Sequence, residues 1–397
     1  MSFSDTFDFL TNNTLSRAEL SSEGKIKNIH YGDILVKFGD ILDCSFTQIP
    51  YISKNAKIGN KVTFLKDGDV IIADTAEDET VGKATEIINV STPIVSGLHT
   101  MACRPKFCFE PRYLGYYINS SCYHNQLFPF MQGVKVTSVG KGNIANTHIR
   151  YPSKQEQQKI SSMLAIIDNR IEKQQALVES LKLYKRGVSE AIFSKKLHFR
   201  NISESRVYTM SKVGTFYNGL SGKSKDDFEN GNAQFITYMN VYKNAIGNIK
   251  MCENVRISSS ETQNKVQYGD VLFSQSSETL EEVGMSSVWL HENTPYLNSF
   301  CFGFRFNNFE NIYPLYMAYY MRSQEIRHKI MKEGQGATRV NLSAERMKNI
   351  KLNIPAFETQ QKIGDFLHTL DQQVIACETA IDKLIETRKA LLQQMFI

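Results

Sequence analysis

The chain has 397 residues, of which 42% are hydrophobic and 22% charged, and its formal net charge at pH 7 is +5. This length allows two or three domains with substantial cores, and the hydrophobic content excludes a disordered chain. The apolar runs fall short of the roughly 20 residues that a membrane-spanning helix needs, so the sequence predicts no membrane segment.

Residues 1–5 lack the charged and then apolar pattern of a signal peptide, so we expect a cytoplasmic protein. The seven cysteines are odd in number and form no CxxC pair, which argues against a disulfide framework and a zinc site. The eight histidines show no metal-ligand spacing. We therefore expect neither a metal nor a cofactor.

Residues 1–150 are expected to form a first domain of mixed α and β structure. Residues 69–72 follow a glycine and predict a short strand, whereas residues 113–118 predict an amphipathic helix with its tyrosines in the core or at its rim. Residues 1–152 carry 15 basic and 15 acidic side chains.

Residues 151–197 predict a long helix and the start of a linker. Pro152 suits a helix start, and apolar residues then recur at alternating spacings of three and four over five heptads, interrupted at Gln174 and Lys185. Residues 153–197 carry nine basic and five acidic side chains. The seam consists of Ile160, Leu164, Ile167, Ile171, Val178, Leu181, Val188 and Ile192.

Residues 198–353 are expected to form a second mixed domain, reached through a polar linker over residues 194–206. Residues 270–273 and 316–321 repeat the strand and helix signals of the first domain. Residues 198–354 carry 18 basic and 15 acidic side chains, a modest excess that falls short of a dense DNA-binding patch.

Residues 354–397 predict a second long helix with the same seam, which Arg388 interrupts. Residues 355–397 carry four basic and six acidic side chains, so the two helices have opposite net charges and are expected to pair. A full domain lies between them in the sequence, which permits antiparallel pairing. The seam consists of Ile363, Leu367, Leu370, Val374, Cys377, Ile381, Leu384, Leu391 and Met395.

The end of the second half of the chain repeats the end of the first half at a constant offset. Gln132 aligns with Gln335 and Phe193 aligns with Phe396, and the alignment between them needs no gap. Two copies of one plan place two related sites about a pseudo-two-fold axis. Such a pair of sites suits a partner that repeats along its length, as duplex DNA does.

The chain resembles the specificity subunit of a type I restriction-modification enzyme. The resemblance rests on two domains that are each followed by a proline, a Gln-Gln-Lys-Ile stretch and a long helix, at residues 152–160 and 355–363. The family usually has Glu-Gln before the basic residue, whereas Gln157 and Gln360 stand at that glutamate position here.

The resemblance implies an α+β fold with two target-recognition domains, separated by a pair of long antiparallel coiled-coil helices. It implies that each domain reads one half of a split target in double-stranded DNA. It also implies that the helices set the gap and dock two methyltransferase subunits, and that restriction (translocase) subunits join for cleavage.

The residues agree that this chain is not itself an enzyme. No Pro-Pro pair is present for the base-clamping loop of an adenine methyltransferase, and Gly222-Lys223-Ser224 matches only the end of a P-loop. Glu23-Gly24-Lys25 has a nuclease-like spacing that arises easily by chance. A coiled-coil interaction scaffold without sequence-specific reading stays open as the alternative.

The best candidates for base reading lie in a glycine-containing loop shared by both halves, because Arg, Lys, Asn and Gln side chains pair with base edges. In the first half these candidates are Gln132, Gly133, Lys135, Thr137 and Ser138, and in the second they are Gln335, Gly336, Thr338, Arg339 and Asn341. Further candidates are Arg17, Lys37, Lys54, Arg104, Lys106, Lys223, Lys225, Tyr238, Asn240 and Lys243. The alternative for the glycine-containing loop is a surface turn with solvated side chains, and for the further candidates it is an ordinary solvated face.

Three residues of the first long helix, Leu177, Leu183 and Tyr184, lie off its seam. Contact with a methyltransferase and packing on the adjacent domain both stay open for them.

Overall fold

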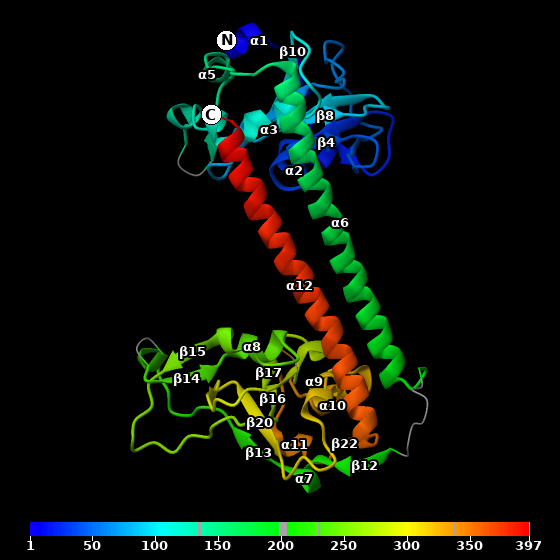
Figure 1. Cartoon of the computed structure of the whole chain (residues 1–397), viewed down its shortest axis with the longest axis vertical. Helices are drawn as coiled ribbons and strands as arrows, with labels where there is room; N and C mark the ends of the chain where they lie inside the picture. Colours follow the sequence, from blue (N-terminus) through cyan, green and yellow to red (C-terminus); the bar gives the residue numbers. More distant parts are fainter. Residues whose placement is uncertain (134–135, 198–204, 229–230, 337, 397) are drawn as a thin grey trace. The chain divides into compact units, whose positions relative to one another are not determined.

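The computed structural model describes residues 1–133, 136–197, 205–228, 231–336 and 338–396. These residues form two compact units. Unit 1 comprises Met1–Gln175 and Thr379–Ile397, and unit 2 comprises Ala176–Glu378. Each unit therefore contains one globular part and one section of each long helix (Figure 1). The expected linker lies mostly outside the described residues, over 198–204.

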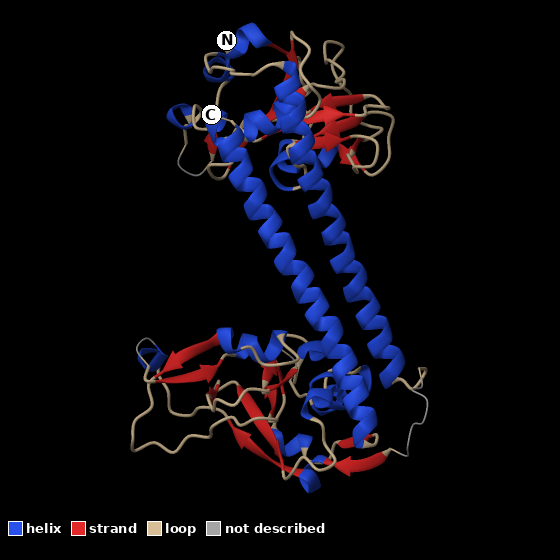
Figure 2. Ribbon diagram, viewed as in Figure 1, coloured by secondary structure: helices blue, strands red, loops and turns tan. Residues whose placement is uncertain are grey.

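Two main sheets form the framework of unit 1, whose strands are drawn in red in Figure 2. The central sheet has the order β1 (Phe7–Phe9), β10 (Thr100–Pro105), β6 (Val70–Ala73), β8 (Ala84–Ile88) and β4 (Ile41–Asp43). The second has the order β2 (Leu20–Ser21), β5 (Tyr51–Ile52), β3 (Lys27–Ile29) and β9 (Ile94–Ser96). Only the β4–β8 and β3–β9 pairs are parallel.

Short helices complete unit 1: α1 (Phe3–Thr6), η1 (Arg17–Glu19), α2 (Tyr31–Val36), α3 (Tyr113–Asn119), α4 (Ser121–His124), η2 (Phe128–Phe130) and α5 (Lys141–Ala145). A two-stranded ladder joins β7 (Thr75–Ala76) to β11 (Thr137–Ser138). The strand predicted at residues 69–72 is present as β6, an apolar run that is buried at every position.

Unit 2 repeats this plan. Its central sheet has the order β13 (Gly214–Asn218), β20 (Cys301–Phe306), β16 (Val271–Ser274) and β18 (Ser286–Val288). Its second sheet has the order β15 (Cys252–Val255), β14 (Ala233–Ile236) and β19 (Tyr296–Leu297), and β14 and β19 are parallel. Two further ladders join β17 (Ser276–Ser277) to β21 (Val340–Asn341), and β12 (Arg206–Thr209) to β22 (Lys351–Ile354).

The helices of unit 2 are α7 (Met210–Val213), η3 (Lys225–Phe228), α8 (Tyr238–Lys243), η4 (Ile249–Met251), η5 (Leu280–Glu282), α9 (Pro314–Tyr320), α10 (Gln324–Glu333) and α11 (Ala344–Met347).

The strand registers show that the duplication extends through the dissimilar first hundred residues of each half. Cys103 pairs with Val70 in unit 1, and Phe304 pairs with Val271 in unit 2. Phe304 therefore follows Cys103 in the sequence by the same number of residues as Val271 follows Val70. Helices α2 and α8 are both six residues long and begin with tyrosine, but their shift is larger. Insertions between these elements hide the repeat from an ungapped comparison of the sequence.

The two predicted long helices are present as α6 (Lys154–Phe193) and α12 (Phe357–Met395). In unit 1, Arg388 of α12 bonds to Asp168 of α6, while residues 391–396 pack in the same core as Ile160 and Leu164. In unit 2, Lys182 lies 2.9 Å from Glu378 and Lys185 pairs with Asp371. Residues later in α6 contact residues earlier in α12. The predicted antiparallel pairing is therefore confirmed within each unit.

The tyrosine-rich helices α3 and α9 join each globular part to its helix pair. Tyr113 and Tyr117 of α3 are buried against Phe396, with ring centroids 5.8 and 5.7 Å away. Tyr316 and Tyr320 of α9 enclose Phe193 in the same way, at 5.9 and 5.7 Å. The prediction that these tyrosines belong to the core is confirmed.

Within the described residues, no helix combines the length and the apolar character needed to cross a membrane.

Candidate nucleic-acid interface

The glycine loop of each unit is a tight hairpin next to a small ladder. In unit 1 the backbones of Gln132 and Ser138 exchange two hydrogen bonds, of 3.1 and 2.9 Å. In unit 2 Gln335 and Asn341 do the same, at 2.9 and 2.7 Å. We name these segments hairpin 132–138 and hairpin 335–341; residues 134–135 and 337, including the candidate Lys135, lie outside the described residues.

The hairpins need glycine at one position. Gly133 and Gly336 have φ values of +126° and +125°, a region that other residues rarely adopt. A Cβ atom would lie 1.9 Å from the Val136 oxygen in the first hairpin and 2.0 Å from the Arg339 oxygen in the second. The glycines therefore fix the shape of a turn whose other side chains are largely exposed, among them Gln335, Thr338, Arg339 and Asn341.

Hairpin 335–341 lies beside the start of α8 in unit 2. Asn341 pairs with Ser276 in the small ladder, and the Tyr238 hydroxyl donates to the Ser276 carbonyl at 2.7 Å. Burial raises the pKa of the Tyr238 phenol, and the nearby Arg339 cation partly opposes that shift. The structure thus brings together Tyr238, Arg339 and Asn341, three residues that the sequence suggested separately.

Hairpin 132–138 has the matching neighbourhood in unit 1. Ser138 pairs with Thr75, whose hydroxyl lies 3.3 Å from Nδ1 of the exposed His99. The His99 ring packs edge-on against Tyr31, the first residue of α2, with centroids 5.4 Å apart. Sequence reasoning missed Thr75, His99 and Tyr31, because nothing in the sequence marks them as neighbours of the hairpin.

Two further candidates of unit 1 meet at one carboxylate. The Arg17 guanidinium donates to Asp33, and Lys37 Nζ lies 3.3 Å from the same side chain. The Asp33 side chain is 2% exposed, whereas those of Arg17 and Lys37 are 51% and 59% exposed. Sequence reasoning found both cations and missed the buried anion that holds them.

Arg104 is removed from the candidate interface, because it belongs to the framework of the sheet. Its Nε and Nη2 donate to the two oxygens of Asp69 at 2.8 and 2.7 Å, and Nη2 also donates to the Phe64 carbonyl. Unit 2 repeats this paired contact with Arg305 and Asp270, at 2.9 and 2.7 Å. A guanidinium occupied in this way on a buried aspartate is not offered to a base.

Two other candidates also have structural partners. Lys106 Nζ donates to the Ser4 carbonyl at 2.8 Å and lies 3.4 Å from Asp8. Asn240 is fully buried, where its amide donates to the Asn248 carbonyl at 2.7 Å and accepts from the Asn248 N–H at 2.9 Å. We remove both from the interface.

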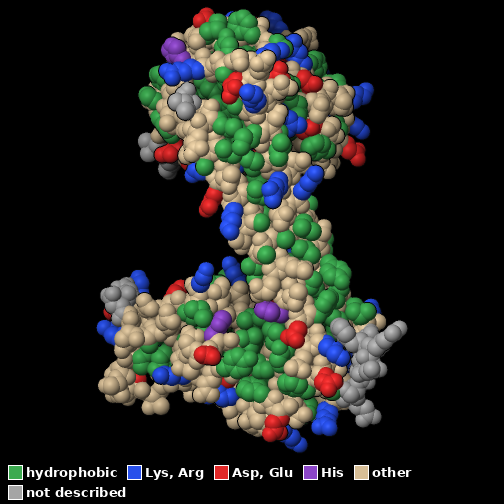
Figure 3. Space-filling view, viewed as in Figure 1, with side chains coloured by type: hydrophobic (Ala, Val, Ile, Leu, Met, Phe, Trp, Pro, Cys, Tyr) green, Lys and Arg blue, Asp and Glu red, His purple; other side chains and the backbone are tan. Residues whose placement is uncertain are grey.

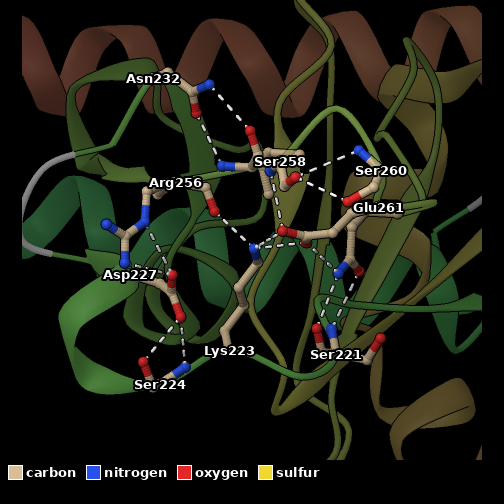
Figure 4. A network of polar contacts seen from close by, with 11 residues as sticks. Ser221, Lys223, Ser224, Asp227, Asn232, Arg256, Ser258, Ser260 and Glu261 are labelled. Carbon is tan, nitrogen blue, oxygen red and sulfur yellow. Dashed lines mark hydrogen bonds and ion pairs between the residues drawn. The ribbon is translucent and has the colours of Figure 1, made fainter.

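Lys223 belongs to the imperfect P-loop motif, and its side chain makes contacts within unit 2 rather than facing solvent (Figure 4). Its side chain is 4% exposed, donates to the Arg256 carbonyl at 2.6 Å and pairs with Glu261. The neighbouring Arg256 pairs with Asp227 at 3.1 Å, so this network ties residues 221–227 to residues 256–261. Lys54, Lys225 and Lys243 are exposed and stay available.

The polar residues that interrupt the helix seams form a repeated contact, which we name the clasp. In unit 1 the Tyr116 hydroxyl donates to Asp168 at 2.7 Å, and Arg388 bonds to Asp168 and to Asp40. In unit 2 the Tyr319 hydroxyl donates to Asp371 at 2.8 Å, and Lys185 bonds to Asp371. Each clasp links a globular part to both helices through tyrosine, aspartate and a cation.

Burial, and then the adjacent aspartate charge, raises the pKa of Tyr116 and of Tyr319. Both phenols therefore stay protonated and act as donors in the clasps. The clasp residues of the two units are equivalent in the sequence repeat. The clasps could therefore have been found by asking what pairs with Lys185 and Arg388 across the helices.

The Gln-Gln-Lys-Ile stretches have a structural role. Gln157 is 3% exposed, accepts from the Glu110 N–H and donates to the Pro152 carbonyl. Gln360 is fully buried, accepts from the Tyr313 N–H and donates to the Asn311 and Pro355 carbonyls. The motif thus anchors the segment before α3 or α9 to the start of the long helix.

Basic and acidic side chains are interspersed over each unit on the face that Figure 3 shows, without a dense basic patch among the residues described there. The described residues also contain no group of three metal-ligating side chains. The arrangement in each unit is a polar, glycine-shaped hairpin beside a tyrosine-led helix, which suits hydrogen bonding to base edges better than binding by bulk charge.

Comparison with known proteins agrees with this geometry. Residues 1–182 and 202–387 each match the family described as "Type I restriction modification DNA specificity domain". The chain belongs to this family. Its two tandem specificity domains make it the DNA target-recognition subunit of a type I restriction-modification system, and the family is a specificity component rather than a catalytic one.

Solved structures share the fold at low sequence identity. The type I restriction-modification S subunit from M. genitalium is 14% identical, with a TM-score of 0.54, over 100% of this chain and 95% of that chain. A chain from a study of complex assembly and conformational transition of the type I R-M system is 15% identical, with a TM-score of 0.61, over 100% and 96%.

Proposed function

We propose that the two globular parts, residues 1–150 and 198–353, each read one half of a bipartite target in double-stranded DNA. The reading surfaces are the two hairpins with the neighbouring starts of α2 and α8. The observation that carries this proposal is the repeated meeting of hairpin, small ladder and tyrosine-led helix in both units. The side chains on this common framework differ, which suits two different half-sites.

The residues retained for DNA contact are those that are exposed or half-buried and close to this framework. They are Gln132, Thr137, Ser138, Arg17 and Lys37 in unit 1, and Gln335, Thr338, Arg339, Asn341 and Tyr238 in unit 2. Gly133 and Gly336 shape the hairpins, and Lys54, Lys225 and Lys243 are candidates for phosphate contact. The interaction-scaffold alternative is not favoured, because both specificity domains match the DNA-recognition family.

We propose further that α6 and α12 set the gap between the half-sites and dock two methyltransferase subunits, with restriction subunits joining for cleavage in the cell. In unit 2, Leu177, Leu183 and Tyr184 of α6 are 46%, 58% and 54% exposed, which supports docking rather than packing on the adjacent domain. The assembled enzyme would supply the methyl transfer and the ATP-driven cleavage that this chain does not perform.

The reading proposal is tested with Arg339→Ala. The target is first defined by selection from randomised duplexes, and binding is then measured on duplexes altered in one half-site at a time. We expect discrimination at the second half-site to fall by about 1–3 kcal/mol, with the first unchanged. Arg206→Ala removes the same charge from an exposed site on β12 and should leave both preferences intact. An equal loss at both half-sites would contradict the role given to hairpin 335–341.

The spacing proposal is tested by deleting one heptad from both helices at matched positions. The preferred gap between half-sites should shorten while each half-site keeps its sequence. An unchanged gap would refute the idea that the helices act as a ruler.

A further inference from the structure

Unit 1 contains an arginine that a buried carboxylate holds at the surface. Arg17 is the first residue of the short helix η1, whose start is stabilised by the hydrogen bond from the Ser16 N–H to the Glu19 carboxylate. Its guanidinium donates to Asp33, whose side chain is 2% exposed, while that of Arg17 is 51% exposed. A guanidinium has five N–H donors in a rigid fork, so one bond to Asp33 leaves donors directed to solvent.

The charges at this point exceed what the fold needs. A buried carboxylate requires a compensating cation, and one is enough. Asp33 has two, since Lys37 Nζ lies 3.3 Å from it on the same helix. The cluster therefore presents a net positive charge through two half-exposed side chains, and this surplus suits an anionic or electron-rich partner outside the protein.

Asp33, which holds Arg17, is also connected to hairpin 132–138 through α2. The Asp33 N–H donates to the His30 carbonyl at 3.0 Å, and burial, followed by the charge of Arg17, lowers the pKa of His30. The His30 ring lies 4.6 Å from Tyr31, and Tyr31 packs on His99 beside the hairpin ladder. An unbroken run of contacts thus links Asp33 and its cations to the proposed reading hairpin.

The equivalent position in unit 2 shows that this cluster is not part of the common framework. When helices α2 and α8 are aligned on their first tyrosines, Asp33 corresponds to Asn240 and Lys37 to Asn244. Asn240 satisfies its amide with Asn248 and needs no cation from the surface. The common fold is thus stable with a neutral side chain here, and the charged version in unit 1 calls for another explanation.

We propose that Arg17, oriented by Asp33, reads a guanine in the first half-site, with Lys37 adding sequence-independent attraction. Arginine pairs with guanine through its O6 and N7 acceptors in the major groove. Because Asp33 fixes the guanidinium beforehand, less side-chain freedom is lost on binding. This inference rests on the proposed function and adds to it one reading residue and one base. It also expects that unit 2, which lacks the Arg17–Asp33 pair, does not read the second half-site in this way.

The test is selection from randomised duplexes with the full chain and four variants, followed by competition binding. The wild type should prefer guanine at one position of the first half-site. Arg17→Gln and Arg17→Lys should both reduce that preference by roughly 10- to 100-fold, because the lysine keeps the charge but not the fork. Asp33→Asn should weaken the same preference by less. Lys37→Gln should weaken binding to all sequences alike.

The base preference at the second half-site serves as the internal control and should be unchanged in every variant. Hydrogen exchange of the α2 amides, unchanged in Arg17→Gln, will show that the fold is intact. The inference is overturned if Arg17→Gln retains the complete first half-site, if the lost preference is for a base other than guanine, or if Arg17→Lys behaves as the wild type. A wild type without any bipartite preference would instead contradict the proposed function itself.

Discussion

The globular parts of units 1 and 2 join the same helix to the same sheet with different side chains. In unit 1, Glu86 of β8 accepts from the N–H groups of Arg112 and Gly115 at the start of α3, at 2.7 and 2.9 Å. By strand register the corresponding residue in unit 2 is Val288. The repeat aligns Pro314, at the start of α9, with Pro111 before α3, so the two units share this proline and differ in the strand residue that faces the helix start.

The other end of this helix differs as well. In unit 1, Asn119 bonds to the backbone of Ala84, and His124 bonds to the Val81 carbonyl. The sequence repeat places Arg322 and Arg327 at these positions in unit 2, and each arginine donates to several backbone carbonyls without a carboxylate. Burial lowers the pKa of both arginines to about 10.

The contacts to the long helices, in contrast, are nearly the same in both units. The buried glutamines, the phenylalanine between two tyrosines and the clasp all recur at equivalent positions of the sequence repeat. The comparison teaches that the helix junction tolerates little change, whereas the sheet and the reading surface accept different chemistry on one backbone plan.

The largest expected effect concerns the phenylalanines at the junctions. Phe396→Ala should destabilise unit 1, and Phe193→Ala unit 2, by about 3–5 kcal/mol each, because both side chains are less than 10% exposed between two tyrosines. Hydrogen exchange resolved by peptide will report each unit separately. Comparable loss of protection in both units from one substitution would break the comparison.

Glu86 should give unit 1 a pH dependence that unit 2 lacks. Burial raises the pKa of Glu86 to about 7 from 4.5, so between these values the folded state holds a proton that the unfolded state has lost. Its stabilising contribution is present below pH 4.5 and is lost as the pH rises to about 7, by about 3 kcal/mol at ~1.4 kcal/mol per pKa unit.

The pH effect is measured as the difference in α3 amide protection between the wild type and Glu86→Gln across this range. The difference isolates Glu86 from other titrating groups. Protection of α9 in unit 2 should not respond to the substitution. A pH-independent difference would show that Glu86 does not titrate differently on folding.

The smallest expected effect separates the two clasps. Arg388→Met leaves Asp40 and Asp168 without their cation and should cost unit 1 about 2 kcal/mol, since Arg388 is only 22% exposed. Lys185→Met removes a single contact to Asp371 and should cost unit 2 about 1 kcal/mol. Denaturant titration monitored in each unit will rank them, and a larger effect from Lys185→Met would contradict the role of Asp40.

Much of the fold could be predicted because periodicity and repetition report burial directly. The heptad seams predicted both long helices, and the repeat predicted the paired architecture. The strands of the dissimilar regions were harder to align, because insertions change the offset between equivalent residues. The offset that relates α2 to α8 differs from the one that relates β6 to β16, and it changes again before the glycine hairpins.

The candidate interface was predicted less well, because charge and residue type do not reveal a side chain's partner. Lys223 and Arg104 have the residue types of DNA contacts, yet both are held by acidic residues that are distant in sequence, Glu261 and Asp69. Conversely, Asp33 and His99 gave no signal, since their importance depends on which elements fold beside them. The hairpin glycines were recognisable because their requirement is local.

The composition of the two units has a consequence for biosynthesis. Unit 2 is one continuous stretch, Ala176–Glu378, whereas unit 1 needs Thr379–Ile397 to complete a core begun by Met1–Gln175. On the ribosome, the early-made portion of unit 1 must therefore wait through the synthesis of all of unit 2, with Tyr113 and Tyr117 lacking Phe396. Unit 2 should therefore fold before unit 1, although most of unit 1 is synthesised earlier. In pulse-labelling of nascent chains, the amides of unit 2 should be the first to acquire protection from exchange.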